Sequence, residues 1–181
     1  MLKNSQHSYG WITITMHWLQ ATTILFMFGL GLYMVDLTYY DPWYRGSLQL
    51  HKSIGILLMV LWIIMIVWKN LNPRLKPEPA PKHELLAAKA MHWALYLTIL
   101  SLLITGYLIS TADGRSIAVF DLFEVPALPK LIENQESVIG DIHEILAFTL
   151  MGFVGLHFLA ALKHHFINKD RTLRRLIKPQ V

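Results

Sequence analysis

The stretch MHWLQATTILFMFGL, residues 16–30, decides the fold because it is an uncharged apolar run that begins with an ionisable histidine. About 20 residues of this kind are enough to cross a bilayer as a helix. A second MHW, at residues 91–93, opens another uncharged run. The chain therefore repeats one pattern, a membrane helix with a histidine close to one end.

The composition extends this interpretation to the whole chain. Of its 181 residues, 54% are hydrophobic and 15% are charged, whereas soluble domains carry about 25% charged residues. We expect an all-α, transmembrane four-helix bundle that forms a single membrane domain. The expected helices cover residues 12–34, 48–69, 88–110 and 142–167.

The connections between these helices predict their orientation. A proline-rich linker covers residues 72–82, and a longer polar loop covers residues 113–141. Twelve of the sixteen lysines and arginines lie in the linker, the two tails and the adjoining helix ends. This asymmetry places both termini in the cytoplasm and the 113–141 loop in the periplasm of a bacterial inner membrane. The basic residues then face anionic lipid, and we expect no nucleic-acid partner.

The absence of cysteine limits the cofactors that the chain can hold. It excludes thiolate metal sites, iron–sulfur clusters and covalent c-type haem attachment. Any metal must therefore be held by histidine or oxygen ligands.

Five of the nine histidines lie within or at the ends of the expected spans, where an ionisable side chain is costly and usually faces the bundle interior. Two lie near the cytoplasmic ends of helices one and three, and two lie at the outer starts of helices two and four. The fifth lies fourteen residues along helix four, a rise of roughly 21 Å that returns it to nearly the same face. In that order they are His17, His92, His51, His143 and His157.

These levels predict two stacked sites. His143 meets His51 at the outer level, and His157 meets either His17 or His92 at the inner level. Two imidazoles facing across a bundle core are what a six-coordinate haem iron needs, and neither level offers the carboxylate or cysteine that would complete a tetrahedral zinc site. Taken singly, the same histidines can be interfacial anchors or interhelical hydrogen-bonding groups, or can line a transporter or proton pathway.

His164 continues the face of His157 to the cytoplasmic boundary. There it can hydrogen-bond a quinone or a haem propionate. An equally plain interpretation is that it belongs to a basic interfacial anchor at the helix end.

Several longer motifs carry a family resemblance that covers nearly the whole chain. Together with the four spans and a short basic tail, the sequence resembles the bacterial cytochrome b561 family, and two of the motifs resemble a subgroup associated with a small periplasmic isoprenoid-binding protein. Those two are YYDPWY at 39–44 and LISTADG at 108–114, and the others are LHKSIGILLM at 50–59, GDIHE at 140–144 and GLHFLAALKHHF at 155–166.

The resemblance implies two haem b groups, the outer one held by His51 and His143 and the inner one by His17 and His157. His92 is then a neighbour of the inner haem or of a quinone. Some family members look like superoxide oxidases, which implies electron transfer from periplasmic superoxide to ubiquinone, a superoxide:ubiquinone oxidoreductase activity. Another implied role is that of a haem-carrying membrane anchor for a separate redox subunit.

The expected outer surface is acidic, which disfavours an anionic substrate and suits a basic periplasmic redox protein. Lys52 and Arg115, with Arg45, can still form a small positively charged patch that attracts superoxide over the outer haem. The nine outer acidic residues are Asp36, Asp41, Asp113, Asp121, Glu124, Glu133, Glu136, Asp141 and Glu144, against four basic ones.

Overall fold

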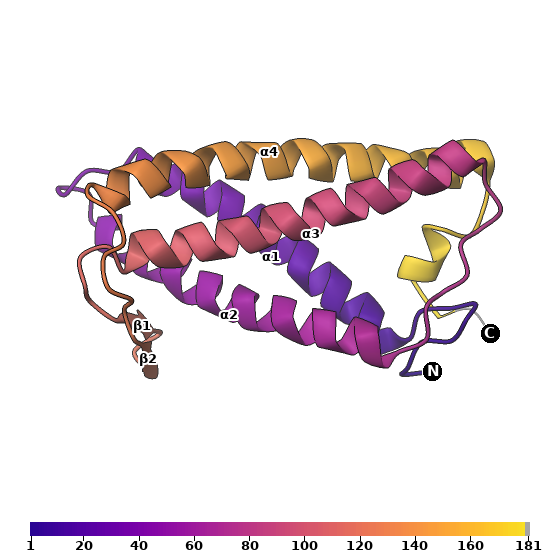
Figure 1. Ribbon diagram of the computed structural model, residues 1–181, viewed down its shortest axis with the longest axis horizontal. Coiled ribbons are helices and arrows are strands. Elements are labelled where there is room, and N and C mark those ends of the chain that lie inside the picture. The colour runs from indigo at the N-terminus through magenta and orange to yellow at the C-terminus, as the bar shows by residue number, and fades with distance from the viewer. Residues whose placement is uncertain (180–181) are drawn as a thin grey trace. The chain divides into compact units, whose positions relative to one another are not determined.

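A computed structural model describes residues 1–179 and is built mainly from four long helices (Figure 1). All four are long and apolar enough to cross a membrane, as expected for a four-helix membrane bundle. The helices are α1 (Trp11–Val35), α2 (Tyr44–Leu71), α3 (Lys82–Ser110) and α4 (Gln135–Lys163). A π-helical turn (His164–Asn168) and a short 3-10 turn (Arg174–Leu176) follow α4.

All four helices begin earlier than the apolar runs indicated, the first by a single residue and the other three by about a turn or more. The second begins at Tyr44 rather than residue 48, the third at Lys82 rather than residue 88, and the fourth at Gln135 rather than residue 142. The added turns are polar, because a helix continues past the hydrocarbon region wherever its backbone remains hydrogen-bonded. For α3, the carbonyl group of Pro81, the residue before the helix, accepts the first backbone hydrogen bonds from Glu84 and Leu85.

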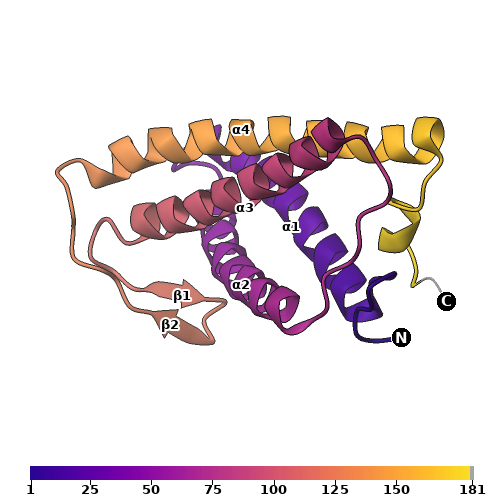
Figure 2. The ribbon, with the colours of Figure 1, turned by 45° about the vertical axis from the view of Figure 1, so that its right-hand side comes forward.

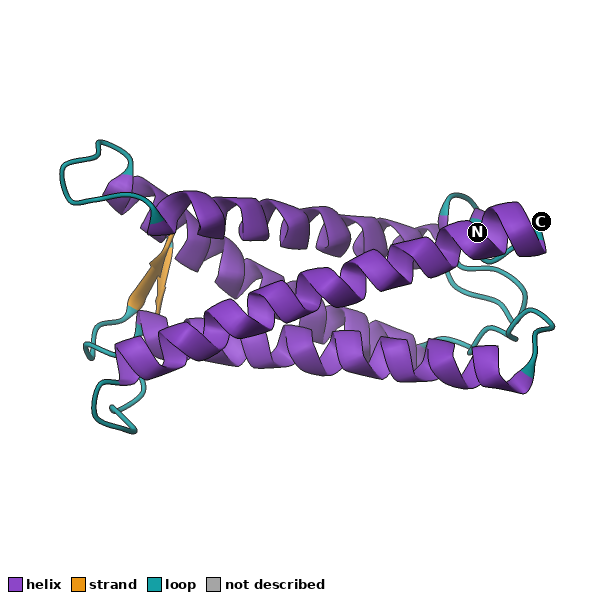
Figure 3. Cartoon of the chain, turned by 90° about the horizontal axis from the view of Figure 1, so that it is seen from above, coloured by secondary structure: helices purple, strands orange, loops and turns teal. Residues whose placement is uncertain are grey.

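The loop between α3 and α4 contains a β-hairpin, which is absent from the expected all-α fold. Its strands are β1 (Ile117–Val119) and β2 (Phe123–Val125), and they pair antiparallel, with Ala118 opposite Glu124 (Figure 2). The turn places Phe120 and Asp121 at φ +50° and +57°, and Leu122 N–H donates to Val119 O at 3.0 Å. Positive φ at both central residues is the type I′ pattern, usually made by Asn-Gly. Figure 3 shows the two strands among the loops.

The hairpin packs against α2 and α3. Val119 and Ile117 are buried with Ile56 of α2, and Tyr107 of α3 packs against the same cluster. The fully buried Ser53 hydroxyl accepts a hydrogen bond from Phe120 N–H at 3.1 Å. Tyr107 OH donates to Pro126 O at 2.6 Å. The hairpin is therefore tied to both helices rather than loosely suspended from them.

The contacts divide the chain into two compact units, and each contains a segment of all four helices. Unit 2 consists of residues 21–60 and 99–148, and includes the hairpin. Unit 1 consists of residues 1–20 and 61–98, together with residue 149 onwards. Candidate functional histidines occur in both units.

Unit 1 gathers both chain ends and the proline-rich linker. Lys76 N–H donates to Gln6 O at 2.9 Å, and Arg175 forms an ion pair with Glu78. The Trp18 indole N–H donates to Leu176 O at 2.7 Å. The linker is thereby held by polar contacts to the N-terminal and C-terminal segments, and the C-terminal segment is held to α1.

Candidate functional site

Unit 2 brings the rings of His51 of α2 and His143 of α4 close together, in an edge-on arrangement. The two ring centroids lie 6.4 Å apart, with an interplanar angle of 72°. Both side chains are half-buried. Two residues of α1 and α3 that lie against these rings are glycines: a Cβ at Gly31 would lie 3.6 Å from His51 Cε1, and one at Gly106 would lie 3.2 Å from His143 Cε1. A side chain at position 106 would therefore crowd the ring of His143.

This separation suits one metal ion between the rings. A metal–imidazole bond is about 2 Å long, and two such bonds plus the distance from each nitrogen to its ring centre give a span of the observed size. Within residues 1–179, no group of three or more His, Asp or Glu side chains is arranged to hold a metal ion. The arrangement therefore suits a metal whose other ligands come from a cofactor.

The nitrogens of this pair have different surroundings. His143 Nδ1 lies 2.8 Å from Thr105 Oγ1. His51 Nδ1 is buried and has no hydrogen-bond partner among the described residues. A charged imidazole in that position would be costly, so His51 is neutral, which is the form that ligates a metal.

Unit 1 contains the second group of histidines. The rings of His92 and His157 lie 5.5 Å apart with an interplanar angle of 65°. His17 lies close enough to interact electrostatically with His157 and His92, and its ring makes an edge contact with Trp18. His17 Nδ1 is buried without a partner in the described part of the chain. The structure thus assembles both expected partners of His157 and does not by itself choose between them.

His164 begins the π-helical turn at the end of α4 and also lies in unit 1. Its Nδ1 lies 2.5 Å from Asp170 Oδ2 and 3.3 Å from Asn168 Nδ2. Burial raises the pKa of Asp170, but the Thr172 backbone N–H and the His164 side chain outweigh it and lower that pKa overall. Asp170 is therefore an anion that orients His164 and leaves the opposite ring nitrogen for another ligand.

Of the cations expected near the outer haem, Arg115 contacts a carboxylate, that of Asp113, and Lys52 influences the same carboxylate electrostatically. Arg115 Nε donates to Asp113 Oδ2 at 2.6 Å, and this bond lowers the pKa of Asp113 and raises that of Arg115. Lys52, next to His51 in the sequence, also interacts electrostatically with Asp113. Because Asp113 offsets one of the two positive charges, the attraction for an anion is weaker than two unpaired cations would provide.

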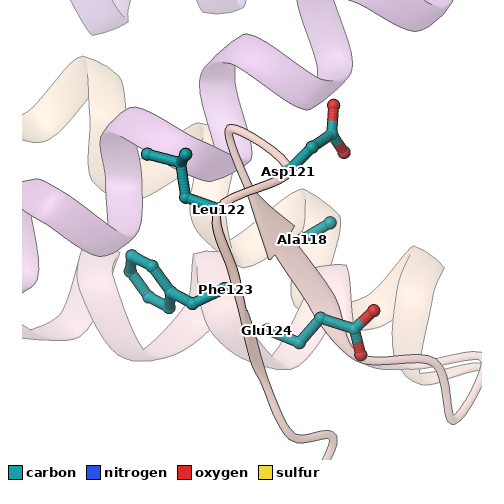
Figure 4. Close-up of a pocket in the computed structure, with 5 residues that line it drawn as sticks. All are labelled: Ala118, Asp121, Leu122, Phe123 and Glu124. Carbon is teal, nitrogen blue, oxygen red and sulfur yellow. The ribbon is translucent and has the colours of Figure 1, made fainter.

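A shallow hollow of about 360 Å³ lies on the hairpin. Figure 4 shows Leu122 and Phe123 pointing to one side of the hairpin, while Asp121 and Glu124 point to the other. No histidine lines it; its lining residues are Ala118, Asp121, Leu122, Phe123 and Glu124. It is an acidic and apolar surface feature rather than part of the histidine sites.

Sequence reasoning missed Thr105 and Asp170. Both act on a histidine through a contact that depends on the folded chain. Thr105 of α3 contacts His143 of α4, and Asp170, just beyond the π-helical turn, contacts His164 at the start of that turn. No spacing motif encodes the first contact. A His–Asp separation of six residues after a helix end is the only signal for the second.

Comparisons with known proteins identify the family of the chain. The family model for prokaryotic cytochrome b561 matches residues 8–179. The chain is 46% identical over 177 residues to cytochrome b561 homolog 2 of Escherichia coli K12, covering 96% of this chain and 93% of that protein. It is 31% identical over 172 residues to the probable superoxide oxidase CybB of Yersinia pestis, covering 93% and 95% respectively. Facing membrane histidines and a family match along nearly the whole chain lead to one conclusion: this protein belongs to the prokaryotic cytochrome b561 family, whose members are membrane electron-transfer proteins carrying b-type haem.

Proposed function

We propose that the chain is a dihaem b-type cytochrome that transfers electrons between a periplasmic partner and the ubiquinone pool. The observation that carries this proposal is the His51–His143 pair, with ring centroids 6.4 Å apart in unit 2. His51 and His143 would hold one haem, and His17 and His157 the other. His92, whose ring lies 5.5 Å from that of His157, would lie beside the second haem.

The residues present fit such groups. The donor set consists of imidazoles alone, a ligand type that suits iron. His51 and His17 each keep a buried Nδ1 without a partner in residues 1–179, which favours neutral rings ready to ligate. When bound, haem supplies reversible one-electron transfer. Two histidine ligands leave no open coordination position, so the surrounding side chains serve to orient the cofactor, exclude water and set its potential.

The proposed orientation has both termini in the cytoplasm of a bacterial inner membrane. It is supported by the excess of lysine and arginine in the linker and the tails. On that side His164, held by Asp170, is the candidate group for hydrogen-bonding ubiquinone. His92 is a second candidate for the same role.

The first test is a reduced-minus-oxidised absorption spectrum of the purified protein, with haem quantified per chain. We expect a low-spin b-type spectrum and two haems per chain, because each pair of imidazoles completes one iron site. Folded, colourless protein from cells with ample haem supply would contradict the proposal. Such a protein would support the histidine-lined transporter instead.

The electron donor we propose is superoxide, as the name of the Yersinia pestis relative suggests for that protein. Lys52 and Arg115 would attract the anion, with Lys52 the stronger contributor because Arg115 is paired with Asp113. Lys52→Gln is expected to slow superoxide-driven ubiquinone reduction about tenfold at low ionic strength, and less in high salt. The measurement is the initial rate of quinone reduction as enzymatically generated superoxide and salt are varied.

Lys130→Gln is the matched control, because it removes the same charge from the exposed loop before α4. Equal rates for Lys52→Gln and the unchanged protein would show that Lys52 does not steer the anion. No quinone reduction at all by the unchanged, haem-loaded protein would exclude superoxide as the donor.

A second candidate function is that of a haem-carrying membrane anchor for another redox protein. The specific observation in its favour is the acidic and apolar hairpin surface, whose lining residues include Asp121, Glu124 and the exposed Leu122. Such a surface suits a basic partner, and the sequence resemblance raises a small periplasmic isoprenoid-binding protein as another. Haem reduction by a reduced basic protein, slowed by Asp121→Asn and Glu124→Gln together, would support this role.

A further inference from the structure

Thr105 of α3 has a hydroxyl group with two backbone carbonyl acceptors in its own helix. Its Oγ1 lies 2.8 Å from Ser101 O and 3.1 Å from Leu102 O, within its own helix. A hydroxyl carries a single hydrogen and two lone pairs. The same oxygen lies 2.8 Å from His143 Nδ1. When that hydrogen is directed to a helix carbonyl, the hydroxyl can act toward His143 only as an acceptor, and His143 Nδ1–H is then the donor.

This hydrogen bond selects one form of His143. A proton on Nδ1 of a neutral imidazole leaves Nε2 with a lone pair for ligation. The backbone of Leu102 also hydrogen-bonds this ring, so a second group of α3 holds it. The neighbouring Gly106 lets the ring approach the backbone, since a Cβ there would lie 3.2 Å from Cε1. Thr105 and its neighbours therefore form a cradle for His143.

The opposite ring has no comparable support. His51 Nδ1 is buried without a hydrogen-bond partner anywhere in residues 1–179. A ligating histidine whose second nitrogen donates to an acceptor is oriented more firmly and is a more basic ligand. The two imidazoles of unit 2 are thus unequal, because the Thr105 hydroxyl and the Leu102 backbone of α3 hold His143, whereas His51 Nδ1 has no partner among residues 1–179.

We propose that Thr105 is a positioning residue that fixes the tautomer and orientation of His143, and thereby sets both the retention and the reduction potential of the haem bound in unit 2. This inference rests on the proposed function. A more basic His143 stabilises the oxidised iron, so the hydrogen bond lowers the potential of that haem. The haem bound in unit 1 has different ligands and serves as an internal reference in the same molecule.

The test compares Thr105→Val with Thr105→Ser in the full-length, haem-loaded protein. Valine keeps the shape and removes the acceptor, whereas serine restores it. We expect Thr105→Val to raise the potential of one haem only, and to speed transfer of that haem to an external acceptor protein about tenfold. Serine is expected to return both quantities to those of the unchanged protein.

Thr111→Val is the matched control. Thr111, the residue directly after α3, is also buried. Its hydroxyl donates to Tyr107 O at 2.9 Å, four residues earlier, as the Thr105 hydroxyl can to Ser101 O. The Thr111→Val variant therefore loses an equivalent bond to the helix backbone. We expect the reduction potential of neither haem to shift. Equal shifts in Thr105→Val and Thr105→Ser, or none in either, would overturn the inference.

A measurement on the unchanged protein covers the case in which Thr105→Val does not fold. In the reduced, low-spin and diamagnetic state, ¹⁵N-histidine NMR should show a His143 Nδ1–H protected from solvent exchange. A His143 Nδ1 without a proton would overturn the inference while leaving the proposed function intact. Unchanged protein that carries no haem on His143 would instead overturn the proposed function.

Discussion

Replacing His143 by alanine is expected to lower the haem content from two per chain to one. The variant loses one of the two imidazoles whose ring centroids lie 6.4 Å apart, and a single remaining ligand cannot hold a six-coordinate iron in place. His51→Ala is expected to have the same effect, because it removes the opposite ligand of the same pair. The measurement is haem per chain after purification, with the spectrum of the remaining haem recorded separately.

The matched control for this experiment is His83→Ala. His83 is an exposed histidine in the first turn of α3, so its removal changes the histidine count without touching either pair. Two haems per chain in His143→Ala would refute its role as a ligand. Loss of both haems from His143→Ala with the fold retained would refute the assignment of the two haems to separate histidine pairs.

Replacing His157 by alanine is expected to remove the other haem and to leave the one held by His51 and His143. His157 is the member of the unit 1 group whose ring contacts His92 and which also interacts with His17. We expect His17→Ala to lose the same haem, and His92→Ala to keep it with an altered spectrum or potential. Haem quantification and a redox titration of the three variants distinguish these outcomes.

The opposite result in the partner variants would reassign the ligand. If His92→Ala loses the haem and His17→Ala retains it, the 5.5 Å contact between the rings of His92 and His157 marks the ligand pair. Retention of both haems in His157→Ala would remove His157 from the set of ligands. His165→Ala, on the turn just beyond α4, is the control for a nearby histidine.

Much of the membrane architecture could be predicted from the sequence because it depends on local properties. The existence of the four spans follows from the length of each apolar run compared with the thickness of a bilayer, and the structure contains four such helices. The polar ends of these helices could not be placed in the same way. The helices that begin at Lys82 and Gln135 start with polar residues that are held by backbone hydrogen bonds. A hydropathy pattern carries no information about such bonds.

The hairpin shows a different limit of prediction. Its strands contain three residues each, and its turn places Phe120 and Asp121 where Asn-Gly is usual. No local preference favours that turn. It forms because Val119 and Ile117 are buried against Ile56 and because Ser53 accepts the Phe120 N–H. These are contacts between segments more than sixty residues apart, and they offset the strain of the turn.

The sequence by itself determined the number of spans, the absence of thiolate chemistry and the levels at which the histidines occur, because each depends on residue type and helical rise alone. Tertiary structure decided which side chains surround each ring. The bond from His143 to Thr105, the glycine beside that ring and the interaction of Lys52 with Asp113 depend on how segments distant in the sequence pack. The physical reason is that a helix forms from hydrogen bonds between residues close in the sequence. A side-chain hydrogen bond of 2.8 Å between two helices requires both backbones to be correctly placed in three dimensions.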